Sequence, residues 1–354
     1  MKPFEELLKE MCELKASDLL LTVGASPQMR INGSLMPTKD PPMDGGSLER
    51  IAFNLLGEER FATLRLKKSV DFSKGFEGLS RFRFNFYYQR DSIAIAIRVI
   101  PFKIPAFEEL GLPVAVKEFA MRPHGLVLIT GPAGSGKSTT LAAMLDFINT
   151  SRRLHIVCLE DPVEYLHHHK LSVIDQREIG EDARSFTEAL HSVFRQSPDV
   201  IMVGEMRDLE TIQLVLSLAE TGHLILGTLH TQDTTHAINR IVDVFPPAQQ
   251  QQIYTQLSMV LVGVVAQQLL VTSDGTRRVM ACEIMNVNQA IRNLIREMQV
   301  QQLYSAVQTG RMDGMVTMNE SLKTLFEKGI IDLGTAMSRS PREKELGRML
   351  GVKQ

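Results

Sequence analysis

The residues with the clearest chemical purpose lie in the stretch GLVLITGPAGSGKSTT, residues 125–140. Residues 126–130 are apolar or β-branched and predict a buried strand, and the next eight residues match the pattern G-x-x-x-x-G-K-[ST]. Glycines let backbone N–H groups turn toward phosphate oxygens, and a helix beginning near Lys137 adds positive partial charge. We expect Lys137 to reach the β- and γ-phosphates and Ser138 to offer its hydroxyl to Mg²⁺. The predicted nucleotide-binding residues are Gly131, Ala133, Gly134, Ser135, Gly136, Lys137, Ser138 and Thr139.

Three carboxylates follow the next expected strand, residues 155–159. In an open parallel sheet, ligands lie at the carboxyl ends of the strands. Carboxylates there would repel a nucleotide unless they hold a metal or accept a proton. We therefore expect Glu164 to orient and deprotonate the attacking water, and Glu160 and Asp161 to shape the metal shell. The alternative is a solvated acidic loop.

Another apolar strand, residues 200–203, is followed by Gly204-Glu205-Met206-Arg207-Asp208. A carboxylate at the end of such a strand beside a phosphate loop is the usual Mg²⁺-side arrangement, so Glu205 is the predicted metal-side carboxylate, with Ser138. Asp199 precedes the strand and is expected at its far end. Arg207 is a candidate for neutralising the negative charge of a phosphate, and an ion pair with Asp208 or Glu210 is an equal alternative.

Histidines occur at two places of interest. His230 follows the fourth expected strand, residues 223–228, where an imidazole could sense a γ-phosphate, and a structural role is an equal alternative; His223, at its start, is expected to be a structural or interface residue. The run His167-His168-His169 does not predict a metal site, because successive strand residues point to opposite faces and no partner has metal-ligand spacing.

Strands alternating with helices from residue 112 predict an α/β domain whose parallel sheet is covered on both faces. Its expected helices are residues 137–149, 186–196 and 209–220. Residues 1–100 predict a small α+β domain, with a strand at 80–88 whose phenylalanines face one side. The predicted divisions are 1–100, a linker at 101–111, an α/β core at 112–288 and a helical region at 289–354.

Several elements complete this prediction. Two helices are expected at 47–56 and 58–66, a hairpin turning on Asn32-Gly33, and a strand at 92–100. A helix is expected over 248–270, a hairpin around 273–275, and helices at 289–296, 301–308 and 319–328. Residues 338–354 are polar with little periodicity and are expected to fray.

Arginines at positions 81, 83 and 98 share the polar faces of the two strands at 80–88 and 92–100 and have no obvious acidic partner nearby in the sequence. Nucleotide-hydrolysing rings often complete a site with an arginine from the neighbouring subunit. Arg81, Arg83 and Arg98 are therefore candidates for that role, and a solvated strand face is the alternative.

Composition narrows the function classes. The chain has 354 residues and a formal net charge of −2, so no overall basic field recruits nucleic acid or an anionic membrane. Its three cysteines are too few and too scattered for a disulfide framework or a four-cysteine zinc site, which suits a reducing cytosol. No apolar run approaches the ~18 residues of a membrane span. Any membrane role is expected to go through partners.

With these residues considered together, the chain resembles the secretion-type ATPase superfamily, specifically the motors that retract type IV pili in twitching motility. The resemblance covers nearly the whole length and rests on motifs at residues 17–33, 131–144, 160–165, 203–212, 219–231, 240–246 and 290–297, the last reading AIRNLIRE. It implies ATP with Mg²⁺, a RecA-like P-loop ATPase core and a PAS-like N-terminal domain. It also implies catalytic and Mg²⁺-side roles for Glu164 and Glu205, and a His box containing His223 and His230.

The resemblance further implies a homohexamer acting on an inner-membrane pilus platform protein, with a cytoplasmic, peripheral location at the pilus base and no nucleic acid.

The sequence also leaves three alternative functions open. An accessory retraction ATPase or scaffold would depend on a paralogous partner motor. A pilus-assembly or type II secretion ATPase usually carries a tetracysteine zinc module, which this sequence does not contain. A nucleic-acid translocase would need a basic, aromatic groove, for which residues 81–90 are the one candidate. AIRNLIRE itself is either a packed helix or a coupling surface.

Overall fold

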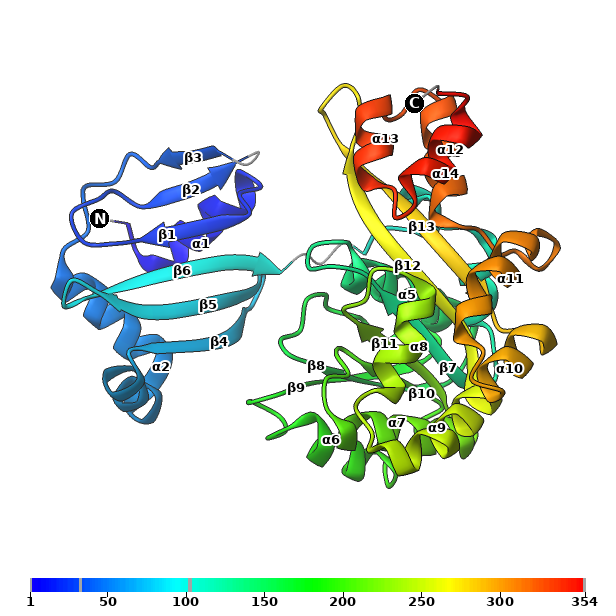
Figure 1. Cartoon of the computed structure of the whole chain (residues 1–354). Coiled ribbons are helices and arrows are strands. Elements are labelled where there is room, and N and C mark those ends of the chain that lie inside the picture. Colours follow the sequence, from blue (N-terminus) through cyan, green and yellow to red (C-terminus); the bar gives the residue numbers. More distant parts are fainter. Residues whose placement is uncertain (1, 32–33, 101–103, 353–354) are drawn as a thin grey trace. The chain divides into compact units, whose positions relative to one another are not determined.

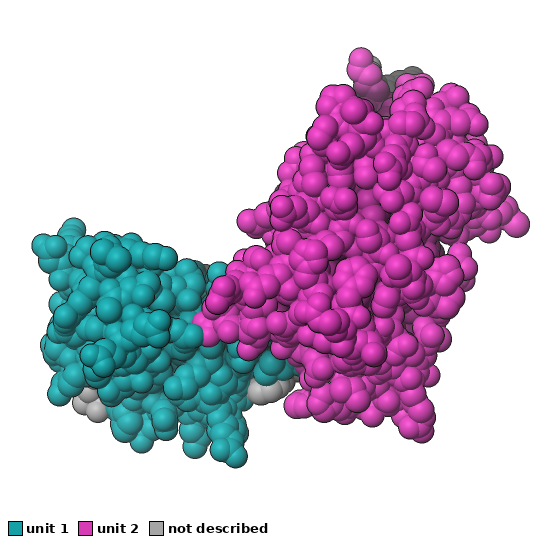
Figure 2. All heavy atoms as spheres, turned by 90° about the horizontal axis from the view of Figure 1, so that it is seen from below, with its two compact units in different colours: residues 1–103, 162–166 teal, residues 104–161, 167–354 magenta. Residues whose placement is uncertain are grey.

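The computed structural model describes residues 2–31, 34–100 and 104–352, which form two compact units. The first unit holds the described residues up to 100 together with 162–166, and the second holds the rest (Figure 2). The expected turn at Asn32-Gly33 and the first three residues of the expected linker lie outside the described residues. Residues 104–111 belong to the second unit and include the short helix α3 (Phe107–Leu110).

The first unit is a six-stranded antiparallel sheet with two helices (Figure 1). The strand order is β3-β2-β1-β6-β5-β4. Its elements are α1 (Phe4–Glu13), β1 (Asp18–Leu21), β2 (Gln28–Ile31), β3 (Ser34–Pro37), α2 (Gly45–Lys67), β4 (Ser69–Phe76), β5 (Ser80–Gln89) and β6 (Ser92–Ile100). The α+β prediction is confirmed.

Alternation along β5 builds the core of this unit. Phe82, Phe84 and Phe86 are fully buried, as their period of two predicts, while their neighbours face the other side. The two helices expected at 47–56 and 58–66 form one element, α2, which is interrupted at Gly57 with φ 71°. Strand β4 was missing from the prediction, and it supplies Phe72, which stacks on Phe84 with ring centroids 5.1 Å apart.

The second unit is a seven-stranded sheet of order β13-β12-β7-β11-β10-β8-β9, parallel except for β13. Its strands are β7 (Gly125–Thr130), β8 (His155–Glu160), β9 (Val173–Glu178), β10 (Val200–Val203), β11 (Leu224–Leu229), β12 (Leu261–Val271) and β13 (Arg278–Asn286). Its helices up to residue 260 are α3, α4 (Val114–Ala120), α5 (Lys137–Ser151), α6 (Phe186–Val193), α7 (Leu209–Glu220), α8 (Thr234–Val242) and α9 (Pro247–Val260). The four strands and three helices predicted here are confirmed; β9 was missing from the prediction.

Burial on both faces explains why the central strands are apolar throughout. Alternate residues of β7 point to opposite sides: Leu126 and Leu128 pack with α6, α7 and α8, whereas Val127 and Ile129 pack with α4 and α5. Every residue of β7, β10 and β11 is buried. The doubly covered α/β class is therefore confirmed, and the carboxyl ends of these strands present the predicted site residues at one edge of the sheet.

The prediction of one helix over residues 248–270 is wrong. Helix α9 ends at Val260, and the chain continues as strand β12, which pairs in parallel with β7. A short apolar run rich in valine cannot be separated from a buried helix by periodicity alone, and here sheet pairing decides. Gly263 permits the fit, because a Cβ there would lie 2.3 Å from the ring of Phe119.

The C-terminal region follows the β12–β13 hairpin and packs against it (Figure 1). Its elements are α10 (Gln289–Arg296), η1 (Val300–Gln302), α11 (Leu303–Thr309), η2 (Arg311–Asp313), α12 (Met318–Glu327), α13 (Leu333–Arg339) and α14 (Glu343–Leu350). The expectation that residues 338–354 fray is wrong for the described part, because α14 forms and Leu346 is fully buried. Asn319 adds polar anchors, donating to the carbonyl of Arg342 and accepting from the hydroxyl of Ser340.

Candidate nucleotide site

The phosphate loop joins β7 to α5, as predicted, and its backbone needs glycine at both ends. Gly131 has φ 147°, and a Cβ there would lie 2.4 Å from the carbonyl oxygen of Gln267 and 2.5 Å from the hydroxyl of Ser135. Gly136 has φ 91° and occupies the N-cap position of α5, where no side chain makes a capping hydrogen bond. The N-terminal end of α5 is thus shaped for an anion rather than for a protein cap.

Lys137 is held inside this loop. Its ammonium group donates to the carbonyls of Gly131 at 2.9 Å and Pro132 at 3.0 Å, and the residue is only 9% exposed. These bonds keep the charge at the centre of the curve formed by residues 131–136. The hydroxyl of Ser135 is buried and has no hydrogen-bond partner among the described residues. A buried donor without a partner is costly, and a phosphate oxygen would satisfy it.

Glu205, Arg207 and His230 meet at the ends of β10 and β11. The Arg207 Nε lies 2.5 Å from Glu205 Oε1, and His230 Nε2 lies 3.1 Å from the same oxygen. Burial raises the pKa of Glu205, but the bond from Arg207 and the charges of His230, Arg207 and Lys137 outweigh it, so its pKa lies below the usual value. Arg207 therefore pairs with Glu205 rather than with Asp208 or Glu210; Asp208 instead caps α7 through Thr211.

The two strand ends that carry this cluster are tied together. The Thr228 hydroxyl donates to the carbonyl of Gly204 at 2.5 Å, and the Met206 N–H donates to the carbonyl of Thr228. A Cβ at Gly204 would lie 3.1 Å from the carbonyl oxygen of Leu159, a tight contact that favours glycine there. His230 is thus placed beside Glu205 by backbone that leaves little freedom.

The acidic segment after β8 is divided between the two units. Glu160 ends β8, is buried, and accepts a hydrogen bond of 2.9 Å from Gln176 of β9. Asp161 is exposed, and its charge contributes to the raised pKa of Arg207 after the larger effect of Glu205. Glu164 is exposed and belongs to the first unit, so the second unit alone does not bring it to Lys137 and Glu205.

The three predicted arginines lie in the first unit, where Arg83 and Arg98 have acidic neighbours that were not predicted. Arg98 pairs with Asp18 at 2.8 Å, and Arg83 lies 3.8 Å from Asp71. Arg81 donates to the hydroxyl of Ser73. These partners come from β1 and β4, distant in sequence or on a strand that was not predicted, so local sequence could not reveal them.

One contributor to the site was not predicted at all. Gln267 of β12 is fully buried and hydrogen-bonded to the phosphate loop and to α5. A polar amide within an apolar run was the available signal, because a buried polar group needs a partner.

The three consecutive histidines do not converge. His169 accepts a bond from the backbone of Ile174, His168 is exposed, and His167 is mostly buried with a Nδ1 atom that has no partner in the described chain. Across residues 2–31, 34–100 and 104–352, no three His, Cys, Asp or Glu side chains are grouped to hold a metal ion. In the same residues, no helix combines the length and apolar character that crossing a membrane requires.

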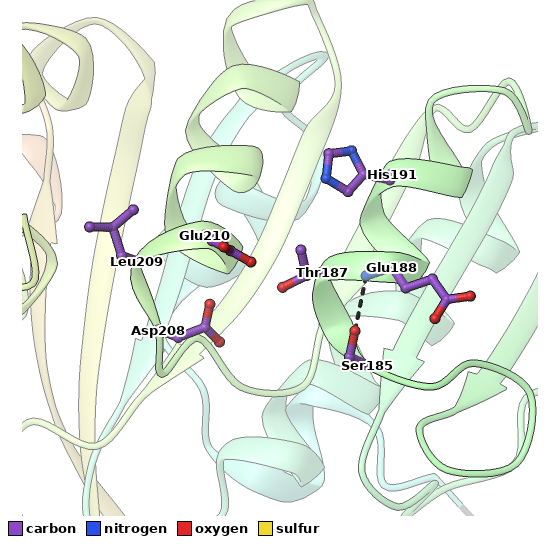
Figure 3. A pocket seen from close by; sticks show the side chains of 7 residues that line it. All are labelled: Ser185, Thr187, Glu188, His191, Asp208, Leu209 and Glu210. Atoms are coloured by element: carbon purple, nitrogen blue, oxygen red, sulfur yellow. Dashed lines mark hydrogen bonds between the residues drawn. The ribbon is translucent and has the colours of Figure 1, made fainter.

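A separate pocket of about 730 Å³ opens between the first turns of α6 and α7 (Figure 3). The His191 ring and the carboxylates of Asp208 and Glu210 face it, whereas the carboxylate of Glu188 points away from it. Ser185 already caps α6 by accepting from the Glu188 N–H. The two carboxylates that face the opening would repel a phosphate, so this pocket is not a second nucleotide site.

Comparison with known proteins agrees with this geometry. Residues 94–329 match the family described as type II/IV secretion system protein. The chain is 43% identical over 335 residues to the type IV pilus retraction ATPase PilT of Pseudomonas aeruginosa, covering 95% of this chain and 97% of PilT. It is 36% identical over 347 residues to the type IV pilus ATPase PilU of the same organism, covering 98% and 91%.

A solved structure also shows similarity to PilT. A crystal structure of the pilus retraction motor PilT with bound ADP superposes with a TM-score of 0.93 at 48% identity, covering 99% of this chain and 100% of that one. The predicted mixed α/β architecture is therefore shared with PilT. The chain belongs to the type II/IV secretion system protein family, and it is similar to PilT over its whole length.

Proposed function

We propose that the chain is a motor ATPase that hydrolyses ATP to power retraction of type IV pili. The observation that carries the proposal is whole-length similarity to PilT together with a phosphate loop that retains its lysine inside the curve. The PilT structure contains ADP, which supports nucleotide binding at this loop. The proposed nucleotide-binding residues are those of the loop and the first turn of α5, residues 131 and 133–139.

The donor set also suits Mg²⁺. A serine hydroxyl at position 138 and a carboxylate at 205 are oxygen ligands of the kind that the ion prefers, and Lys137 contributes to the low pKa of Glu205. When bound with the nucleotide, Mg²⁺ would neutralise phosphate charge. Lys137 would hold the transferred phosphate, and His230 would sense it from its place beside Glu205. Glu164 would orient and deprotonate the attacking water.

The arginines of the first unit support a site shared between copies of the chain in a homohexamer. Arg83 and Arg98 lie directly opposite each other on β5 and β6. Asp18 and Asp71 each offset one of these charges, and both guanidinium groups stay partly exposed, where an anionic phosphate from a neighbouring copy would bind them. Arg81 lies two residues along the same strand. Such a trans contribution is worth roughly 10³-fold or more in rate in other nucleotide hydrolases.

The proposed organisation is a PAS-like domain at 1–100, a linker at 101–111, a RecA-like core at 112–288 and a helical region at 289–354. The motor would act in the cytoplasm at an inner-membrane pilus platform.

Helix α10 carries the AIRNLIRE motif. In α10, Ile291 and Ile295 are buried, Ala290 is exposed, and Arg292 donates to the carbonyls of Ser258 and Met259 at the end of α9. The helix expected at residues 289–296 therefore forms, and it packs through Ile291 and Ile295 and through the hydrogen bonds of Arg292.

Similarity to PilU favours one alternative, an accessory retraction ATPase that needs a partner motor. The test deletes the gene for this chain in its source bacterium and measures the number of surface pili and their retraction force. A principal motor predicts abundant pili that do not retract, with no recovery when Lys137→Ala is supplied. Retraction that persists at reduced force would indicate the accessory role, and loss of surface pili would instead indicate an assembly ATPase.

A further inference from the structure

We propose that Gln267 is a positioning residue that fixes the phosphate loop in its binding shape; this inference rests on the proposed nucleotide site. Gln267 lies on β12, one residue beyond Ala266, which is paired with Thr130 at the end of β7. Its side chain therefore emerges beside the start of the loop. It is fully buried in a strand whose other core positions are apolar.

Both ends of the Gln267 amide are used on the nucleotide-binding segment. Its Nε2 donates to the carbonyl of Ser135 at 2.9 Å, and its Oε1 accepts from the hydroxyl of Thr140 at 3.0 Å. The first bond reaches the tip of the loop and the second reaches the first turn of α5. One side chain thus joins two parts of the phosphate cradle to the same strand.

The Ser135 bond also sets the direction of a loop N–H. In a trans peptide, the carbonyl of Ser135 and the N–H of Gly136 point in opposite directions. Anchoring that carbonyl on Gln267 therefore turns the Gly136 N–H away from β12. At the start of α5, such inward N–H groups are the ones that receive phosphate oxygens.

Packing around Gln267 leaves the loop little room to relax. The main-chain oxygen of Gln267 would lie 2.4 Å from a Cβ at Gly131, and its Nε2 would lie 3.2 Å from a Cβ at Gly136. Leu269, two residues along and on the same face, touches the position of Gly136 as well. Gln268 points the other way and donates to the carbonyl of Arg339 at 3.4 Å, far along the chain in α13.

The test measures Mg²⁺-ADP affinity of the purified full-length chain by calorimetry. Gln267→Met keeps the side-chain length and removes both hydrogen bonds, and it should raise the Kd for ADP about tenfold, the scale of one or two lost hydrogen bonds. The KM for ATP should rise by a similar factor while kcat changes less than about threefold, since loop contacts exist in ground and transition states alike. Gln268→Met is the matched control and should bind ADP like the wild type.

Thr140→Val provides a milder variant, which removes only the bond to Oε1 and should raise the Kd about threefold. The inference is overturned if Gln267→Met folds and binds ADP within twofold of the wild type, or if Gln268→Met loses as much affinity. If Gln267→Met does not fold, wild-type affinity in Thr140→Val overturns it. Hydrolysis of ATP by the wild type is measured separately. ADP binding without hydrolysis would refute the proposed ATPase activity, but the Kd values of the variants relative to the wild type would still test the role of Gln267. No ADP binding by the wild type would refute both the proposed function and this inference.

Discussion

The carboxylate of Glu205 is held by Arg207 at 2.5 Å, with His230 at 3.1 Å on the same oxygen. Arg207 is largely exposed, so its guanidinium can leave the pair without a large desolvation cost. The metal-side carboxylate of the proposed site is therefore occupied by a cation that Mg²⁺ would have to displace or share.

Removing that competing cation should lower the Mg²⁺ requirement. Arg207→Gln is expected to reduce the Mg²⁺ concentration for half-maximal ATP hydrolysis by about two- to fivefold, the scale of an exposed ion pair of up to about 1 kcal/mol. A Mg²⁺ titration at saturating ATP measures it. Arg311→Gln is the control, because Arg311 pairs with Glu320 in the C-terminal region. An unchanged or higher requirement in Arg207→Gln would show that the pair does not compete with the metal.

Acid should weaken the second unit through His167. Burial, with a smaller contribution from the charges of Lys170 and His168, lowers the pKa of His167 to about 4, against an opposing effect of Asp146. An unfolded histidine titrates near 6.5, so the unfolded chain binds a proton that the folded chain excludes. The stability contribution is present above pH 6.5 and is lost as the pH falls toward 4.

Between pH 7 and pH 5 this linkage amounts to about 2 kcal/mol in the free energy of unfolding. Urea titrations at both pH values should show that His167→Asn loses about that much less stability than the wild type over the interval. His168→Asn, at the exposed neighbour, should behave like the wild type. Equal pH dependence in the wild type and His167→Asn would mean that His167 is not held neutral.

The final helix should stabilise the C-terminal region. Leu346 of α14 is fully buried with Leu322 and Ala336, so Leu346→Ala should cost about 2–5 kcal/mol through lost burial and a cavity. Amide exchange across α12 and α14 would locate the loss. Leu333 of α13, which is 36% exposed, offers a milder comparison, since Leu333→Ala removes a side chain that is only partly buried and should cost less than Leu346→Ala. A Leu346→Ala chain as stable as the wild type would restore the expectation of a frayed end.

The sequence was sufficient to predict features formed by contiguous residues, but not contacts between residues that are far apart in the chain. The phosphate loop is contiguous, so its pattern, strand and helix could all be recognised from residues 125–151. Gln267 lies 132 residues from Ser135, and Asp18 lies 80 residues from Arg98, so neither pairing leaves a trace in local spacing. Pairing with β7 made residues 261–271 a strand, although their apolar run fits a helix equally well.

Residues 162–166 show that closeness in sequence does not predict which unit a residue belongs to. The acids at 160, 161 and 164 are close in sequence and were expected to act together. The fold keeps Glu160 and Asp161 in the second unit and groups Glu164 with the first. Its role as the water-orienting base consequently remains a proposal that hydrolysis must test.

Steady-state ATP hydrolysis by the purified hexamer-sized fraction, at equal nucleotide occupancy for each chain, tests the proposed motor site most directly. We expect hydrolysis by the wild type, strong losses in Glu164→Ala and Arg83→Ala, and recovery when Arg83→Ala is mixed with Lys137→Ala, because mixed rings contain sites with both intact partners. A wild type that binds ATP but hydrolyses it no faster than Glu164→Ala would show that the chain is not a motor ATPase.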